Sequence, residues 1–197
     1  TFLLCREASK NYKVLLSGDG ADELFWGYPR FLSVIDYKDW FKYPKYLRLK
    51  WAGILRRFNR KISSCIEYDN IQDWVFDRQS PFWISQVKKL MPQAVNSFFT
   101  KRLYTIPNSV KTSRELLIWL RKNEFNGHLQ RVLLKVDRAS MAHGIEVRVP
   151  FLDRKIIDFS TFISPELGIS HRNTKYLLKN ILKNYIPENF YLQNKQG

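Results

Sequence analysis

The chain has 197 residues, with 33 Lys plus Arg against 18 Asp plus Glu, so its formal net charge is +15. Hydrophobic residues make up 45% of it, which is enough apolar surface for a folded core and excludes a disordered basic tail. No apolar run approaches the ~18 residues that a membrane span needs. The chain also lacks a signal-peptide pattern, and Cys5 and Cys65 show neither metal nor disulfide spacing, so we expect a reducing, cytoplasmic setting.

The first part of the chain predicts a strand, a glycine turn and a helix. Residues 6–13 are typical of the end of a helix and a turn, and Val14-Leu15-Leu16 is a short apolar run that predicts a buried strand. Ser17-Gly18-Asp19-Gly20 predicts a tight polar turn that leads into a helix from Ala21. This order is typical of a ligand site in an α/β fold.

The rest of the chain is predicted to be mostly helical. Apolar residues recur at spacings near three and four over residues 28–61, which favours helix, and residues 62–112 predict short helices and connections. Further helices are predicted over 113–134, over about 154–162 and over about 174–185. Asp153 is placed to cap the second of these, and Pro187 to end the last. We therefore expect an α/β chain with little strand.

Acidic residues gather in the turn after the first strand. Asp19, Asp22 and Glu23 stand within seven positions of Ser17. Carboxylates this close together need a cation, and hard oxygen ligands suit Mg2+ when substrate phosphates complete the coordination. The alternative is a surface turn in which Asp19 and Asp22 cap the following helix.

A second charged segment runs from Lys135 to Asp153. Its charged residues alternate with small and apolar ones, which is unusual for a purely solvated face. If buried, these charges must be paired, and the candidates are Asp137, Arg138, Glu146 and Arg148. An internal ion-pair network explains them as well as ligand contact does. His143 in the same segment is interpreted as a packed or surface histidine.

Two lysines near the end of the chain, Lys175 and Lys195, are candidates for binding phosphate. Lysine is a compact point charge that suits phosphate and leaving-group oxygens. A solvated helix surface favours lysine equally, so composition leaves both interpretations open.

Four ordered segments resemble one enzyme family. Residues 14–25 with Gly27-Tyr28 resemble the SGEGADELFGGY motif of glutamine-hydrolysing asparagine synthetases. Residues 136–153 resemble that family's VDRxSMAxxxExRxPFLD motif, and residues 174–178 and 194–197 resemble its two C-terminal lysine motifs. The resemblance implies the later part of a synthetase domain, which has a Rossmann-like, adenine nucleotide alpha hydrolase-like ATP pyrophosphatase fold.

The same resemblance implies a reaction and a set of roles. In this family ATP activates a carboxylate as an acyl-adenylate with release of pyrophosphate, and ammonia then displaces AMP. By resemblance, Ser17 and Gly18 contact ATP, Asp22 binds Mg2+, and Lys175 and Lys195 neutralise charge on the phosphates. Asp19, which stands where many members have Glu, supports the adenylate. The residues expected around the substrate are Asp137, Arg138, Glu146 and Arg148.

The chain also departs from the family pattern. The SGGxDS loop and the N-terminal glutaminase, which would supply ammonia, do not occur between Thr1 and Gly197, so we expect a fragment that is inactive alone. Trp26 stands where many members have Gly, which predicts a change in the neighbouring pocket.

Several alternatives remain open at this point. L-aspartate is the expected acceptor carboxylate, and a sugar acid is the alternative. A basic module that binds nucleic acid or another anionic surface would explain the charge, but no nucleic-acid-binding motif supports specific binding. A degenerate homologue that serves as a scaffold is a third hypothesis, and the oligomeric state, including a homodimer, is open.

Overall fold

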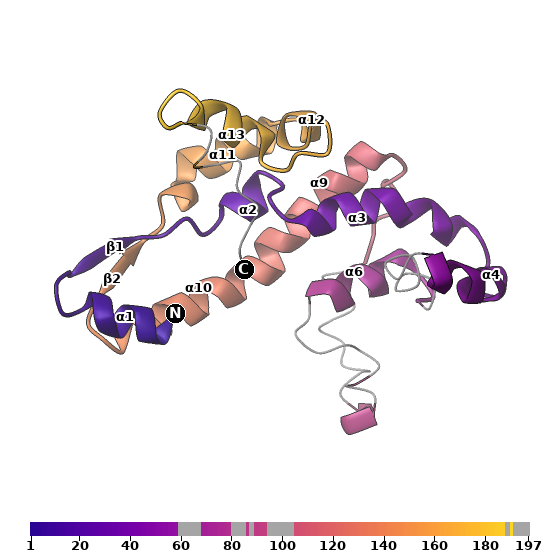
Figure 1. Cartoon of the computed structure of the whole chain (residues 1–197), viewed down its shortest axis with the longest axis horizontal. Coiled ribbons are helices and arrows are strands. Elements are labelled where there is room, and N and C mark those ends of the chain that lie inside the picture. The colour runs from indigo at the N-terminus through magenta and orange to yellow at the C-terminus, as the bar shows by residue number, and fades with distance from the viewer. Residues whose placement is uncertain (59–67, 80–85, 87–88, 94–104, 188–189, 191–197) are drawn as a thin grey trace. The chain divides into compact units, whose positions relative to one another are not determined.

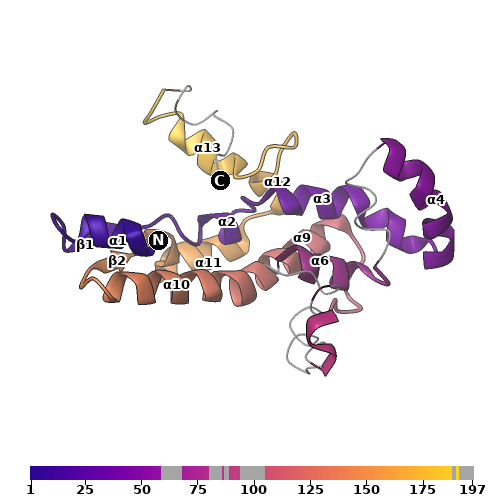
Figure 2. The ribbon, with the colours of Figure 1, turned by 60° about the horizontal axis from the view of Figure 1, so that its bottom comes forward.

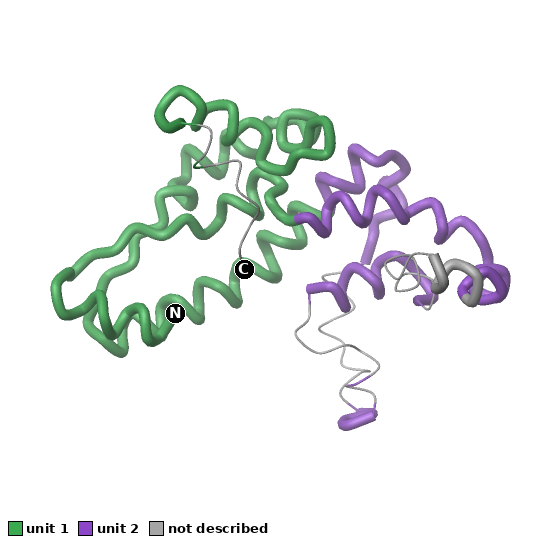
Figure 3. The backbone as a smooth tube through the Cα atoms, in the orientation of Figure 1, with its two compact units in different colours: residues 1–28, 120–197 green, residues 29–119 purple. Residues whose placement is uncertain are grey.

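The computed structural model describes residues 1–58, 68–79, 86, 89–93, 105–187 and 190, without the side chains of residues 53–58. It divides the chain into two compact units (Figure 3). Unit 1 comprises Thr1–Tyr28 and Leu120–Gly197, and unit 2 comprises Pro29–Trp119. Among the described helices, none combines the length and the apolar character needed to cross a membrane.

Unit 1 is built on a two-stranded parallel sheet. Strand β1 (Val14–Leu16) pairs with β2 (Glu146–Arg148), with Leu15 opposite Val147 (Figure 1). The backbone N–H of Ser17 continues the ladder by donating to the carbonyl oxygen of Arg148 at 2.8 Å. The strand over 14–16 is confirmed, but the prediction that it is buried is wrong, because Val14 and Leu16 are 41% and 76% exposed. The sequence does not predict the second strand, because three residues that alternate charged and apolar side chains indicate paired charges as readily as a strand.

Two helices pack together beside this sheet. Helix α1 (Phe2–Ala8) packs against α10 (Leu129–Met141), which also contacts β2. Gly144, with φ of 62°, ends the turn after α10, and Ile145 beyond it is fully buried. A left-handed glycine after a helix is a common way to reverse the chain. The turn therefore brings the chain from α10 back into β2.

A long helical segment leads into α10. Helix α9 (Ser113–Asn123) starts in unit 2, and the π-helical turn η3 (Glu124–His128) joins it to α10 in unit 1. The helix predicted over 113–134 is confirmed and extends to Met141. It extends because Asp137 and Arg138 lie on the exposed side of α10, where charges do not interrupt a helix.

After β2, the described residues form the 3-10 turn η4 (Pro150–Leu152), α11 (Arg154–Phe162), α12 (Pro165–Gly168) and α13 (Tyr176–Leu182). The Asp153 carboxylate accepts from the backbone N–H of Lys155 at 2.8 Å, so the predicted cap and the predicted helix over 154–162 are both confirmed. Figure 2 shows α12 next to α13. The last helix starts later than the predicted residue 174, because Lys175 takes a left-handed backbone conformation, and it ends at Leu182, before the predicted residue 185.

Unit 2 contains α3 (Pro29–Tyr37), the 3-10 helix η1 (Lys38–Lys42), α4 (Lys45–Phe58) and α6 (Ile71–Gln79). The helical stretch predicted over 28–61 is therefore broken where the described residues cover it. The break falls at Tyr43, which is extended, because the residue before a proline disfavours the helical region. Trp74 is buried in this unit, with its ring 6.2 Å from Tyr37 and 5.9 Å from Phe41.

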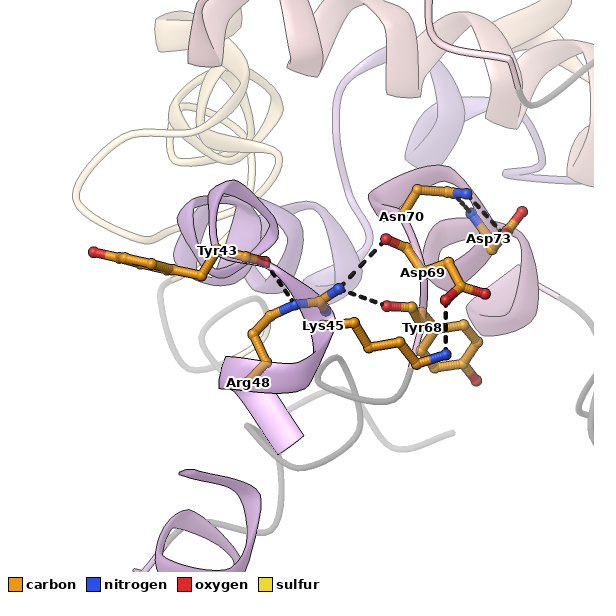
Figure 4. Close-up of polar contacts among 7 residues, drawn as sticks. All are labelled: Tyr43, Lys45, Arg48, Tyr68, Asp69, Asn70 and Asp73. Carbon is orange, nitrogen blue, oxygen red and sulfur yellow. Dashed lines mark hydrogen bonds and ion pairs between the residues drawn. The ribbon is translucent and has the colours of Figure 1, made fainter. Parts of the chain in front are cut away.

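A buried arginine holds α4 to the start of α6. The Arg48 side chain is 2% exposed and donates to the carbonyl oxygens of Tyr43 at 3.1 Å and Tyr68 at 2.9 Å (Figure 4). It also donates to the Asp69 carbonyl at 3.4 Å, and the Asp69 carboxylate pairs with Lys45 at 2.7 Å. One side chain thus satisfies carbonyl groups from two separate segments.

We predict that Arg48→Met destabilises unit 2. The substitution keeps an apolar stem but removes the donor from part-buried hydrogen bonds to carbonyl groups of two segments, which costs about 1–3 kcal/mol. Urea unfolding followed by near-UV circular dichroism measures the change. Lys50→Met on the same helix is the control, since Lys50 is exposed and its loss is expected to change stability by at most about 0.5 kcal/mol. Equal midpoints for the two variants would contradict the role of Arg48.

Candidate functional site

The turn after β1 lies where the carboxyl ends of two parallel strands meet. Ligands of open α/β folds bind at such an edge. The Ser17 hydroxyl donates to the Asp19 carboxylate at 2.7 Å, and the Asp19 backbone N–H donates back to the Ser17 Oγ at 3.3 Å. These two bonds give the turn its own shape, and both side chains remain partly accessible.

The two glycines of the turn serve different purposes. Gly20 has φ of 89°, and a Cβ there would lie 2.6 Å from Leu152 Cδ2. It therefore combines a left-handed backbone with close packing against η4, a contact that the ring pair Phe25 and Phe151 reinforces at 6.1 Å. Gly18 has open space where its Cβ would be, so this side of the turn is accessible to a ligand.

An ion pair joins two of the predicted site residues. Lys175 Nζ lies 2.8 Å from Asp22 Oδ1, and the side chains are 30% and 21% exposed. Asp22 lies on α2 (Ala21–Leu24) and Lys175 at the start of α13, so the fold brings together residues of two separate sequence motifs. A half-buried pair of this kind is stronger than one on an open surface.

Two further carboxylates lie buried close to Asp22. Glu23 is 2% exposed and accepts from the Tyr28 hydroxyl at 2.7 Å. Burial raises the pKa of the Glu23 carboxyl, the nearby Asp22 and Glu124 carboxylates raise it further, and the Tyr28 hydrogen bond opposes both effects. Glu124 itself is buried on η3. The sequence analysis does not identify Glu124 as a site residue. The only feature of the sequence that could have indicated it is an acidic side chain within a predicted amphipathic helix.

The charged residues of the second segment lie on β2 and α10, and the backbone of Arg148 lies next to Ser17. Glu146 and Arg148 share one face of β2 and pair with each other at 2.8 Å, with both side chains exposed. Asp137 and Arg138 are exposed on α10, and their side chains form no ion pair within the described part of the chain. The expected pairing is thus found for Glu146 and Arg148 alone. Lys195 and Cys65 lie outside the described residues, and Cys5 is a free, buried thiol.

Trp26, the departure from the family pattern, is fully buried with φ of 51°. The Arg121 guanidinium lies over its indole, 4.6 Å from the ring centroid, and donates to the Ser160 carbonyl oxygen. A Cβ on Gly168 would overlap the ring. The indole therefore packs among the ends of α9, α11 and α12, which accounts for its bulk.

The site can accommodate Mg2+ through one carboxylate. Among the residues that the structure covers, no group of three or more His, Cys, Asp or Glu side chains could hold a metal. Mg2+ is often held by one or two carboxylates while phosphates and water supply the remaining ligands. Asp22 fits that role for a metal that arrives with a nucleotide, provided that Lys175 moves off its Oδ1 atom.

Comparison with known proteins gives the family. The family model described as asparagine synthase matches residues 1–197. The chain belongs to the asparagine synthase family. It is 30% identical over 210 residues to asparagine synthetase [glutamine-hydrolyzing] 1 of Bacillus subtilis (strain 168), a match that covers 100% of this chain and 32% of the relative.

More distant relatives show the same pattern of coverage. A putative asparagine synthetase [glutamine-hydrolyzing] of Mycobacterium tuberculosis (strain ATCC 25618 / H37Rv) is 26% identical over 100% of this chain and 31% of its own length. The human asparagine synthetase [glutamine-hydrolyzing] is 34% identical over 33% of this chain and 12% of its own length. The chain thus spans about a third of the length of the first two relatives. No solved structure matches it.

The prediction that the chain is part of an α/β synthetase domain is confirmed. The chain belongs to the asparagine synthase family, and its described residues are mostly helical with a small parallel sheet.

We predict that Glu23→Gln reduces the pH dependence of stability. The Glu23 pKa is raised above its ordinary value of 4.5, so the folded state binds the proton more tightly than the unfolded state does. The resulting stabilisation is fully present below the ordinary pKa and is lost as pH rises through the folded-state pKa, by about 1.4 kcal/mol per unit of displacement. Glutamine keeps the acceptor for Tyr28 and removes this loss.

Urea midpoints measured from about pH 4 to about pH 8 test this. The unaltered chain should lose stability across the lower part of this range relative to Glu23→Gln. Glu7→Gln on α1 removes an exposed glutamate as a control and should follow the unaltered chain. If the urea midpoints of the unaltered chain and Glu23→Gln change with pH in the same way, protonation of Glu23 does not contribute to the pH dependence of stability.

Proposed function

We propose that the chain forms part of an ATP-dependent amide-forming ligase that converts L-aspartate to asparagine. The observation that supports this most directly is the Asp22–Lys175 contact, at 2.8 Å, beside the open turn that holds Ser17 and Gly18. A carboxylate suited to a metal and a lysine suited to phosphate, both next to an accessible glycine turn, are the groups that a reaction on ATP requires.

In the proposed first step, a carboxylate oxygen of aspartate attacks the α-phosphorus of ATP. A P–O bond forms, the bond to pyrophosphate breaks, and negative charge accumulates on the phosphate oxygens. Lys175 is proposed to neutralise that charge, and the open space at Gly18, where no Cβ stands in the way, supports a close approach of the backbone to the nucleotide. Bound Mg2+ would supply further charge neutralisation, with Asp22 as its protein ligand.

In the second step ammonia attacks the activated carbonyl carbon, and the C–O bond to AMP breaks as the nitrogen loses a proton. Asp19, which accepts from the Ser17 hydroxyl at 2.7 Å, is the carboxylate that we propose to support this step. Lys195 is proposed as a second phosphate-binding lysine from the family resemblance. The names of the relatives state that they hydrolyse glutamine, and we propose glutamine as the source of the ammonia here too.

We predict that Asp22→Asn lowers pyrophosphate release by roughly 100-fold or more, the scale seen when one charge-stabilising group is lost. The assay follows pyrophosphate formed by the natural protein from ATP with L-aspartate and ammonia. Asp158→Asn is the matched control, because Asp158 is an exposed aspartate on α11 that pairs with the exposed Arg154 at 3.8 Å. Its rate should stay within about twofold of the unaltered rate.

The acceptor is tested in the same assay. Release that requires a sugar acid in place of L-aspartate would keep the ligase mechanism and change the substrate. Wild-type rates for Asp22→Asn would remove Asp22 as the metal ligand, and no release with any carboxylate would contradict the proposed function.

A further inference from the structure

Gly27 lies directly against the Asp22–Lys175 ion pair. It follows α2, and its backbone N–H donates to the carbonyl oxygen of Asp22 at 2.8 Å. A Cβ on Gly27 would overlap both Asp22 Oδ1 and Lys175 Cε, and would lie 2.7 Å from Asp22 Cγ. The three atoms nearest to that empty position therefore all belong to the ion pair.

Glycine is needed at position 27 because a larger side chain would not fit beside the ion pair, and not because of the backbone conformation. Gly20 and Gly144 have left-handed backbones, whereas Gly27 does not, so an alanine could adopt the same backbone conformation. What alanine could not do is leave room for both the carboxylate oxygen and the lysine stem. This separates Gly27 from glycines that are needed for a turn.

The lysine reaches this position from a constrained segment. Lys175 has φ of 54°, and His171 and Arg172 before it have φ of 48° and 63°. Ser170 and Asn173 exchange backbone hydrogen bonds of 3.1 Å and 2.7 Å, which close the turn between them. Left-handed backbone at residues other than glycine persists only where surrounding contacts hold it, and the contact with Asp22 is one of these.

We propose that Gly27 is a positioning residue that seats Lys175 against Asp22. The lysine ammonium lies 2.8 Å from Asp22 Oδ1, so it pairs with the carboxylate that would hold a metal ion. When phosphates bind, the lysine moves to them and the carboxylate becomes available to the metal. This exchange of partners rests on the proposed function, whereas the role of Gly27 in the Asp22–Lys175 ion pair does not.

The test measures how fast the Lys175 amine reacts with acetic anhydride, read by mass spectrometry of the Lys175 peptide. In Gly27→Ala the pair is forced apart, and we expect labelling to rise roughly 5-fold, a change that the loss of a half-buried ion pair allows. Asp22→Ala should raise labelling similarly. Gly168→Ala is the matched control, because its Cβ meets the Trp26 ring and not the ion pair, so it should leave Lys175 labelling unchanged.

Thermal unfolding tests whether a second substitution, Asp22→Ala, restores the stability that Gly27→Ala removes. Gly27→Ala should lower Tm by roughly 2–10 °C through overpacking, and most of this loss should disappear in the Asp22→Ala background, where the overlapped oxygen is gone. If Gly27→Ala does not fold, recovery of folding in the double variant supports the proposal equally. Unchanged Lys175 labelling in folded Gly27→Ala, or an equal loss of Tm in both backgrounds, would overturn it.

Adding Mg-ATP to the labelling reaction separates the two proposals. A change in the rate of Lys175 labelling when Mg-ATP is added, in either direction, supports the exchange of partners. The Mg-ATP arm uses the natural protein. If Gly27→Ala raises labelling while Mg-ATP changes nothing in the natural protein without the substitution, the role of Gly27 stands, whereas the exchange of partners and the proposed contact of Lys175 with the nucleotide fail.

Discussion

The parallel pairing of β1 with β2 is the interaction on which unit 1 depends. Each strand has three residues, and the Ser17-to-Arg148 backbone hydrogen bond extends the ladder to the first residue of the glycine turn. Without this pairing, the turn after β1 and the segment after β2 would be unrelated parts of the chain. With it, Gly20 packs against Leu152, and the helices that follow η4 lead back to Lys175. The position of the site is thus a consequence of one short ladder.

Electrostatics at this edge differ from those of the chain as a whole. The chain carries a formal charge of +15, yet the groups around α2 are acidic, with Asp22 half-buried and Glu23 and Glu124 buried. Lys175 is the cation that the structure places on Asp22. Buried carboxylates strengthen the attraction for any positive group that enters, because the medium around them screens charge poorly. The local field therefore favours a cation at the site, whereas most of the chain's basic residues would attract anions.

The sequence predicted the parts of this structure that depend on local chemistry. The strand over 14–16, the Asp153 cap and its helix, and the helix from residue 113 follow from apolar spacing and capping, and all were found. Contacts between distant segments could not be predicted from local sequence. Residues 146–148 form a strand because they pair with β1, and the importance of Glu124 and Gly27 depends on the residues that pack beside them. Asp22 and Lys175 were both named in advance, but their contact depends on the path of the chain between α2 and α13. The roles assigned to the site residues remain predictions.

The packing of Trp26 constrains how this region could change during evolution. The indole has room because residue 168 is glycine, and the Arg121 guanidinium covers its face. A substitution at any one of these three positions would leave a steric overlap, an emptied volume or a buried cation that has lost its aromatic partner. Viable sequences are therefore expected to change at these positions in concert. A segment exchanged with another family member would have to carry residues 26, 121 and 168 together, even though more than half of the chain separates the first from the last.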